Sequence, residues 1–155
     1  MSQVSFENRT VIVTGAGNGL GKAYALDLGS RGAKVVVNDL GGAVDGSGSG
    51  STPADEVVNE IIANGGEAVA NYDSVASKEG GESIVQTAID NFGTVDAVVN
   101  NAGILRDKSF ANMSEEELSL IIDVHLKGTF FVSQPAFRAM KENAYGRIVN
   151  VASPS

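Results

Sequence analysis

The 155-residue sequence contains no cysteine and a single histidine, His125. Without cysteine the chain cannot form a disulfide, a thiolate nucleophile or a cysteine-bound metal site. One histidine likewise excludes a metal site held by several histidines. No apolar stretch approaches the roughly 20 residues that a membrane-spanning helix needs. The opening MSQVSFENRT also lacks the basic-then-apolar pattern of a secretory signal, so the sequence predicts a cytoplasmic protein.

Basic side chains are also scarce, with 11 Lys and Arg against 19 Asp and Glu and a net charge of -8. Nucleic acids are bound through a basic face, so neither a nucleic-acid partner nor a membrane partner is expected. Hydrophobic residues make up 43% of the chain and charged residues 19%. These proportions and the length are typical of one soluble globular domain.

What the sequence does contain is an alternation of short apolar runs with longer amphipathic stretches. In the first amphipathic stretch we expect Leu20, Ala23, Tyr24, Leu26 and Leu28 to suit packing on a sheet. Five strands that alternate with helices predict an α/β fold: a doubly wound parallel sheet of Rossmann type, with helices on both faces and ligands at the carboxyl ends of the strands. Strands are predicted over 10–14, 33–39, 67–73, 95–103 and 146–153, and helices over 20–31, 57–63, 80–91 and 114–141.

Two stretches depart from this regular pattern. Gly128 and Pro135 are possible irregularities within the last predicted helix. The segment 41–52, GGAVDGSGSGST, is longer and richer in Gly and Ser than an ordinary connection between a strand and a helix. It suits a surface insertion and a flap beside a ligand equally well.

The loop after the first predicted strand has the sequence TGAGNGLG, Thr14 to Gly21. Glycine lets a backbone approach a pyrophosphate closely, and a helix N-terminus offers free N–H groups and a positive dipole. The spacing is T-G-x-x-x-G-x-G, because Leu20 stands where the G-x-G-x-x-G fingerprint needs its third glycine. No Lys-Ser or Lys-Thr pair follows, which excludes a phosphate-loop NTPase. The stretch therefore predicts a nucleotide-binding loop of another type.

Three further motifs close the next three predicted strands. Asp39, 18 residues after Gly21, can accept hydrogen bonds from ribose hydroxyls and would repel a 2′-phosphate, which favours NAD over NADP. Asp73-Ser74 could reach an adenine edge, and NNAG (100–103) could tie strand ends together. Each motif alone also suits an ordinary turn. Their common position at the carboxyl ends of consecutive strands is what indicates a cofactor site.

The order of these motifs, followed by GRIVNVAS, resembles the short-chain dehydrogenase/reductase family over the whole chain. More narrowly, VVVNDLGG, EAVANYDSV, NNAGILRDKSF and DVHLKGTF are similar to the (3R)-hydroxyacyl-CoA dehydrogenase domains of type 2 peroxisomal multifunctional enzymes and to their bacterial single-domain relatives. The resemblance implies NAD-dependent oxidation of a secondary alcohol, such as a 3-hydroxyacyl-CoA or a steroid, by a homo-oligomeric parent protein. It also makes a peroxisomal location the alternative to a cytoplasmic one.

The resemblance further implies which residues hold the cofactor and the substrate. His125 stands where many family members carry an Asn that helps to hold a proton-relay water, but a lone helical His is more often structural and is not assigned to catalysis. The implied cofactor residues are Gly15, Asn18, Gly19, Leu20 and Gly21 in the pyrophosphate loop, Asp39 at the ribose, Asp73, Ser74 and Val75 at the adenine, and Asn101, Ala102 and Gly103 near the nicotinamide-side ribose. Ser153 is the implied catalytic serine, which hydrogen-bonds the substrate oxygen.

The family's catalytic pair, spaced Y-x-x-x-K, is absent from the sequence. The three tyrosines, Tyr24, Tyr72 and Tyr145, are followed four positions later by Leu, Ala and Val. We therefore expect an inactive N-terminal fragment of a dehydrogenase, truncated after the fifth strand. The alternatives are a non-catalytic dinucleotide-binding or regulatory module, and a truncated product that folds poorly because its fifth strand is an unpaired edge.

Overall fold

The computed structural model describes residues 4–42 and 52–152, apart from the side chain of Thr52. It contains one parallel sheet in the order β3-β2-β1-β4-β5. The predicted doubly wound α/β fold is confirmed, and all five strands lie within their predicted ranges. The strands are β1 (Thr10–Thr14), β2 (Lys34–Asn38), β3 (Glu67–Asn71), β4 (Ala97–Asn100) and β5 (Arg147–Asn150).

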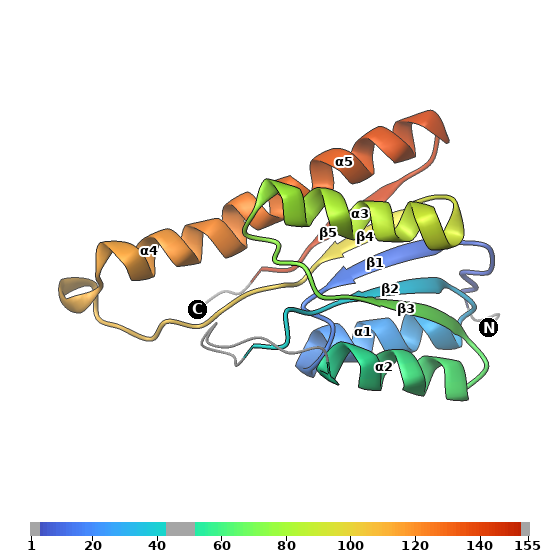
Figure 1. Ribbon diagram of the computed structural model, residues 1–155, viewed down its shortest axis with the longest axis horizontal. Helices are drawn as coiled ribbons and strands as arrows, with labels where there is room; N and C mark the ends of the chain where they lie inside the picture. Colours follow the sequence, from blue (N-terminus) through green and yellow to red (C-terminus); the bar gives the residue numbers. More distant parts are fainter. Residues whose placement is uncertain (1–3, 43–51, 153–155) are drawn as a thin grey trace.

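Helices cover both faces of the sheet (Figure 1). On one face lie α1 (Gly19–Ser30) and α2 (Thr52–Ala63); on the other lie α3 (Lys78–Phe92) and α5 (Gly128–Glu142). Successive strand residues alternate between the two layers: Val11 and Val13 pack with α1 and α2, whereas Ile12 packs with α3 and α5. Both faces of β1 are therefore buried in apolar cores.

The packing of α1 confirms the expectation in part. Tyr24, Leu26 and Leu28 are partly buried against the core, whereas Leu20 is 63% exposed and Ala23 is exposed. The fully buried residues form a stripe of small side chains, Gly21, Ala25 and Gly29. A Cβ added at Gly29 would lie 2.9 Å from Ile61 Cγ2. The small residues therefore let α1 approach α2 closely, and the apolar side chains of Tyr24, Leu26 and Leu28 pack beside them.

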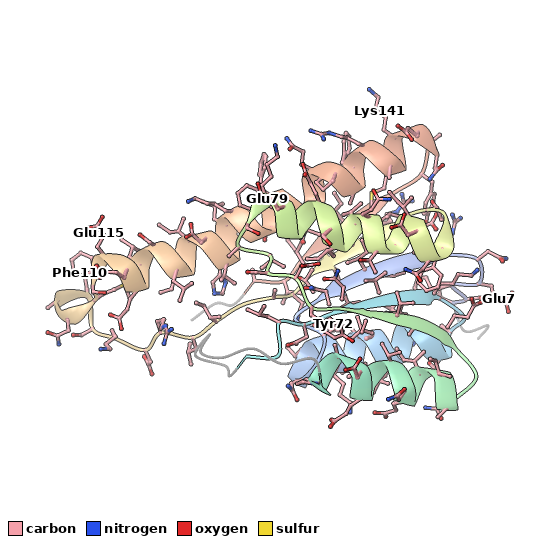
Figure 2. All side chains as sticks on the ribbon, in the orientation of Figure 1. Glu7, Tyr72, Glu79, Phe110, Glu115 and Lys141 are labelled. Carbon is pink, nitrogen blue, oxygen red and sulfur yellow. The ribbon has the colours of Figure 1, made fainter. Side chains whose placement is uncertain are left out.

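The long predicted helix 114–141 is divided into three parts. It comprises α4 (Glu115–Ile122), the π-helical turn η2 (Asp123–Lys127) and α5. The irregularity thus lies just before Gly128, while Pro135 lies inside α5. A short 3₁₀ turn, η1 (Phe110–Asn112), precedes α4. Together η1 and α4 project beyond the carboxyl end of the sheet, where Phe110 and Glu115 mark the tip (Figure 2).

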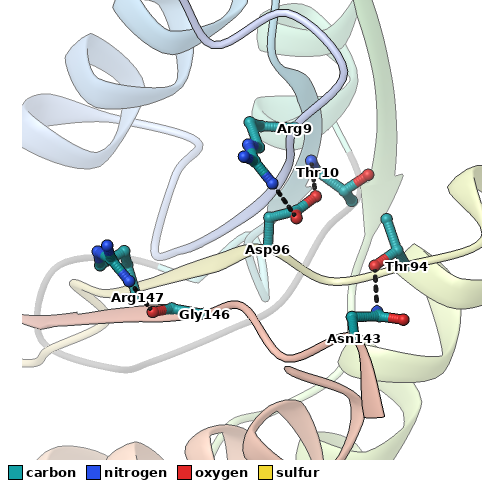
Figure 3. A network of polar contacts seen from close by, with 7 residues as sticks. All are labelled: Arg9, Thr10, Thr94, Asp96, Asn143, Gly146 and Arg147. Atoms are coloured by element: carbon teal, nitrogen blue, oxygen red, sulfur yellow. Dashed lines mark hydrogen bonds and ion pairs between the residues drawn. The ribbon is translucent and has the colours of Figure 1, made fainter. Parts of the chain in front are cut away.

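The amino end of the sheet is joined by a polar network around Asp96 (Figure 3). The Asp96 carboxylate, 6% exposed, accepts from the Thr10 N–H at 2.9 Å and from the Arg9 guanidinium at 3.0 Å. Arg9 also lies over the Tyr145 ring, 3.8 Å from its centroid. These contacts fasten β1 to β4 and to the turn before β5. Within the described ranges, none of the helices combines the length and apolar character needed to cross a bilayer.

Candidate functional site

The last residue of every strand is polar and lies at the carboxyl end of the sheet. Asn38 donates through Nδ2 to Asn71 Oδ1 at 2.8 Å, and Asn100 donates to Asn150 Oδ1 at 2.9 Å. Thr14 lies in register with Asn38 on the central strand. These bonds hold neighbouring strand ends side by side, so the loops that follow the strands all begin at the same edge of the sheet. The expectation that the NNAG segment ties strand ends together is confirmed by the Asn100–Asn150 bond, whereas nothing in the sequence indicated the Asn38–Asn71 bond.

The loop after β1 is bonded directly to the NNAG segment after β4. Thr14 Oγ1 accepts from the backbone N–H groups of Asn101 and Ala102 at 3.1 and 3.0 Å. In return, Asn101 Nδ2 donates to the carbonyl oxygens of Thr14 and Gly15, both at 3.0 Å. Side-chain and backbone groups thus clamp two predicted cofactor loops together.

The glycines of the first loop have different physical roles. A Cβ added at Gly15 would lie 2.8 Å from Ala102 Cα, and one at Gly21 would overlap the Gly15 carbonyl. A Cβ at Gly17 would lie 2.8 Å from the Asp39 carboxylate. These three glycines are required by contacts within the protein. Gly19 differs: its φ is +53°, and a Cβ there would have none of the described residues within 4 Å. Open space at the start of α1 is where an anion could approach the helix N-terminus.

Asp39 links that loop to the segment after β2. Its Oδ2 accepts from the Gly17 N–H at 2.7 Å, and its Oδ1 accepts from the Gly41 N–H at 2.8 Å. A carboxylate has about four acceptor positions, so each oxygen keeps capacity for a further donor such as a hydroxyl. Asp39 is therefore oriented by two backbone amides beside the open N-terminus of α1.

The residues expected at an adenine are less available. Asp73 Oδ2 accepts from Asn71 Nδ2 at 2.9 Å and from Ser83 Oγ at 2.7 Å, so its carboxylate joins β3 to α3. Ser74 Oγ accepts from the Ala76 N–H, and Val75 is only 8% exposed. A contact between these residues and an adenine stays a prediction.

His125 lies in the π-helical turn η2 and contacts the chain just after NNAG. Its Nε2 is 3.1 Å from the Ile104 nitrogen and 2.9 Å from the Ile104 oxygen. A Cβ added at Gly103 would lie 2.8 Å from the His125 ring, so the glycine makes room for it. Turns of π-helix are frequent at functional sites. The sequence indicated an irregularity close to Gly128 but did not indicate this contact.

Two sequence expectations fall outside the described residues: Ser153, and the segment 43–51 that makes up most of the Gly-rich loop. Within the part of the chain that the structure describes, no group of three His, Cys, Asp or Glu could hold a metal ion. A pocket of about 340 Å³ lies elsewhere, around Gly29, Gly32 and Gly66 at the ends of α1 and α2. None of the predicted cofactor residues lines it.

Comparisons with known proteins place these features in context. A family model described as short chain dehydrogenase matches residues 9–155. The chain is 58% identical to the peroxisomal hydratase-dehydrogenase-epimerase of Saccharomyces cerevisiae over 98% of this chain and 17% of that protein. It is 56% identical to the peroxisomal multifunctional enzyme type 2 of Mus musculus over 99% of this chain and 20% of that protein.

Two solved structures are also similar. A short chain dehydrogenase from Mycobacterium avium matches with a TM-score of 0.84 and 48% identity, covering 95% of this chain and 55% of that one. A 7α-hydroxysteroid dehydrogenase, complexed with NADH and 7-oxo glycochenodeoxycholic acid, matches with a TM-score of 0.87 and 31% identity, covering 96% and 55%. The chain thus spans about half of these solved structures and a smaller share of the two curated relatives.

Proposed function

The chain belongs to the short-chain dehydrogenase family, and we propose that it is the cofactor-binding part of an NAD-dependent oxidoreductase acting on the CH–OH group of a secondary alcohol. The substrate class that we propose is a 3-hydroxyacyl-CoA, with a steroid as the second candidate. The names of the yeast and mouse relatives and of the hydroxysteroid dehydrogenase support these two classes. The observation that carries the proposal is Asp39, held by Gly17 beside the open N-terminus of α1.

The residues present fit a nicotinamide dinucleotide. Gly19 leaves open space in front of the first N–H groups of α1, which suits a pyrophosphate. Asp39 keeps acceptor capacity for two ribose hydroxyls and carries the charge that would repel a 2′-phosphate. Asn101 and Thr14 hold the two flanking loops at a fixed separation. We propose that these groups bind and orient the cofactor. None of them is assigned as the base that removes the hydroxyl proton of the substrate.

Bound NAD would supply the hydride acceptor for the alcohol carbon. The protein must then remove the hydroxyl proton, which in this family is done by a tyrosine whose pKa a neighbouring lysine lowers. None of the three tyrosines here is followed by lysine four positions later. We therefore propose that this 155-residue chain binds the cofactor without turning over substrate.

Isothermal titration tests the binding proposal. We expect the chain to bind NADH at least about tenfold more tightly than NADPH, because a 2′-phosphate beside the Asp39 carboxylate is repelled. The variant Asp39→Ala should reduce the ratio of the NADPH dissociation constant to the NADH dissociation constant. Asp27→Ala, which removes an exposed carboxylate paired with Arg31 on α1, should leave the ratio unchanged. Equal affinities for NADH and NADPH in the unchanged chain would refute the role of Asp39.

A second candidate function is a non-catalytic dinucleotide-binding or regulatory module, which would need the loops around Gly19 and Asp39 but no Y-x-x-x-K pair. An assay with 3-hydroxyacyl-CoA and a panel of secondary alcohols bears on both candidates. Steady NADH formation by this chain would contradict the proposed inactivity. NADH binding without turnover, in a protein that carries no Y-x-x-x-K pair anywhere, would favour the module.

The location that we propose is peroxisomal rather than cytoplasmic, because the two curated relatives are peroxisomal by name. Fluorescence microscopy of the tagged protein in its own cells tests this. A diffuse signal that does not overlap a peroxisomal marker would support the cytoplasmic alternative. We also propose a homo-oligomeric parent, which the size of that protein in solution would test.

A further inference from the structure

Two Asn-Gly pairs lie at the ends of helices, and they differ in surroundings. Asn18-Gly19 lies at the start of α1 within the cofactor loop, and Asn64-Gly65 follows the end of α2. Both asparagines are exposed. In an Asn-Gly pair the glycine carries no side chain, so its backbone nitrogen can approach the asparagine amide carbon without steric hindrance. The attack of a glycine nitrogen on an asparagine amide carbon can therefore be compared between two different environments in the same chain.

The backbone N–H of the glycine differs between the two pairs. The Gly65 N–H donates to the Ile62 carbonyl at 2.9 Å, which ties up that nitrogen. Gly19 is the first residue of α1, where N–H groups have no acceptor within the helix. Among the described residues its N–H has no hydrogen-bond partner. The Gly19 nitrogen is therefore the freer nucleophile.

The Asn18 side chain at the first pair makes no capping bond either. Asn18 occupies the N-cap position of α1, with φ -144° and ψ 171°. Attack requires rotation about the Asn18 Cα–C bond, which carries Gly19 towards the side chain. Within the described part of the chain, no atom would lie within 4 Å of a Cβ added at Gly19, so there is space for that movement.

We propose that Asn18 is a site of spontaneous deamidation that inactivates the cofactor loop and that bound cofactor protects. The Gly19 backbone nitrogen forms a bond to Asn18 Cγ, the Cγ–N bond breaks, and ammonia leaves with the proton from the Gly19 N–H. Water then opens the resulting succinimide at one of its two carbonyls and leaves aspartate or isoaspartate. The net change is hydrolysis of an amide, with water as the co-reactant and no oxidation or reduction.

Conversion of Asn18 to aspartate places a negative charge in the loop and breaks no side-chain capping bond, because Asn18 makes none. Aspartate is also a favourable N-cap residue and interacts favourably with the positive end of the helix dipole. The fold therefore survives conversion to aspartate. An anion approaching the same helix N-terminus would meet a like charge. This consequence rests on the proposed binding of a dinucleotide pyrophosphate at α1, whereas the deamidation itself does not.

Peptide mass spectrometry of the chain aged at mildly alkaline pH tests the reaction. We expect Asn18 to deamidate several-fold faster than Asn64 when no cofactor is present. Saturating NADH should slow the reaction at Asn18 and leave Asn64 unchanged. Equal rates at the two sites, or a faster rate at Asn64, would overturn the proposal. So would an Asn18 rate unaffected by NADH in a chain that a separate titration shows to be saturated.

Matched charge variants test the consequence. Asn18→Asp should weaken NADH binding about tenfold or more, whereas Asn64→Asp adds the same charge after α2 and should leave binding unchanged. Far-UV circular dichroism should show both variants folded. Equal NADH affinity in the two variants would overturn inactivation of the loop. Failure of the fresh, unaltered chain to bind NADH would instead overturn the proposed function, and the deamidation rates would still decide the reaction.

Discussion

The strands β1 and β5 are made of similar residues but lie in opposite environments. In β1, Val11, Ile12 and Val13 are at most 2% exposed. In β5, Ile148 and Val149 are 38% and 51% exposed. Both runs predict a strand equally well, since Val and Ile suit pleated, half-buried backbone. The difference shows that burial is a property of the neighbours: β1 has a strand on each side and a helical layer on each face, whereas β5 is an edge.

The helices near the two strands show the same contrast. On α3, Ile84 and Val85 are buried in the core that Ile12 shares. On α4 no residue is buried, and the exposed side chains of α4, η2 and α5 include large apolar ones. These are Leu118, Ile122, Leu126, Phe130 and Phe137. The predicted cofactor loops thus extend from the well-packed part of the molecule, while much of its exposed apolar surface lies on the flank with α4, α5 and β5.

The largest expected effect comes from shortening the same side chain in the two strands. Ile12→Ala leaves a cavity in the closed core and should reduce the free energy of unfolding by about 2–5 kcal/mol. Ile148→Ala removes the same atoms from a partly exposed site and should cost less than about 1 kcal/mol. Urea unfolding followed by circular dichroism measures both. Equal losses would show that β5 is as tightly packed in solution as β1.

A smaller loss of stability is expected at Asp96, which joins β1 to β4 and to the turn before β5. Asp96→Ala removes the acceptor of the Thr10 N–H, a backbone group in a residue only 1% exposed, and should cost about 1–3 kcal/mol. Arg9→Ala removes the partly exposed cation of the same pair and should cost less than about 1 kcal/mol. The same unfolding experiment compares them. If the two losses were equal, the ion pair rather than the buried amide would be the main contribution of Asp96.

The sequence predicted the parts of the site that depend on local chemistry. The strand positions, the T-G-x-x-x-G-x-G loop, Asp39 and NNAG all follow from residues close together in the chain. It did not predict the contact between Gly17 and Asp39, the Asn38–Asn71 bond or the His125–Ile104 contact. Those depend on which strands become neighbours and on the register between them. The sequence also did not predict the stripe of small residues on α1. Small side chains are needed there because α1 packs closely against Ile61 of α2, a contact that depends on the tertiary structure.

The smallest effect concerns the start of α4, on the exposed side of the comparison. Ser114 and Glu117 form a capping box: the Glu117 N–H donates to Ser114 Oγ at 3.2 Å, and the Ser114 N–H donates to Glu117 Oε2 at 3.1 Å. That backbone hydrogen bond from Ser114 lowers the pKa of Glu117 below its ordinary 4.5, and the charges of Lys108 and Arg106 lower it further. A carboxyl group with a depressed pKa in the folded state stabilises that state above its unfolded pKa. The contribution is lost as pH falls from about 4.5 through the depressed value.

We therefore expect α4 to lose helicity on acidification below about pH 4.5 before the strands around Ile12 change, because α4 has no buried residue to hold it. Carbon-13 chemical shifts along α4 and β1, recorded during an acid titration, measure the two transitions separately. Glu117→Gln should reduce the pH-dependent loss of helicity in α4. Glu115→Gln, on the same turn but outside the capping box, should leave it in place. A single transition shared by α4 and β1 would mean that the two regions unfold together, and that the exposed flank is coupled to the core more tightly than its packing indicates.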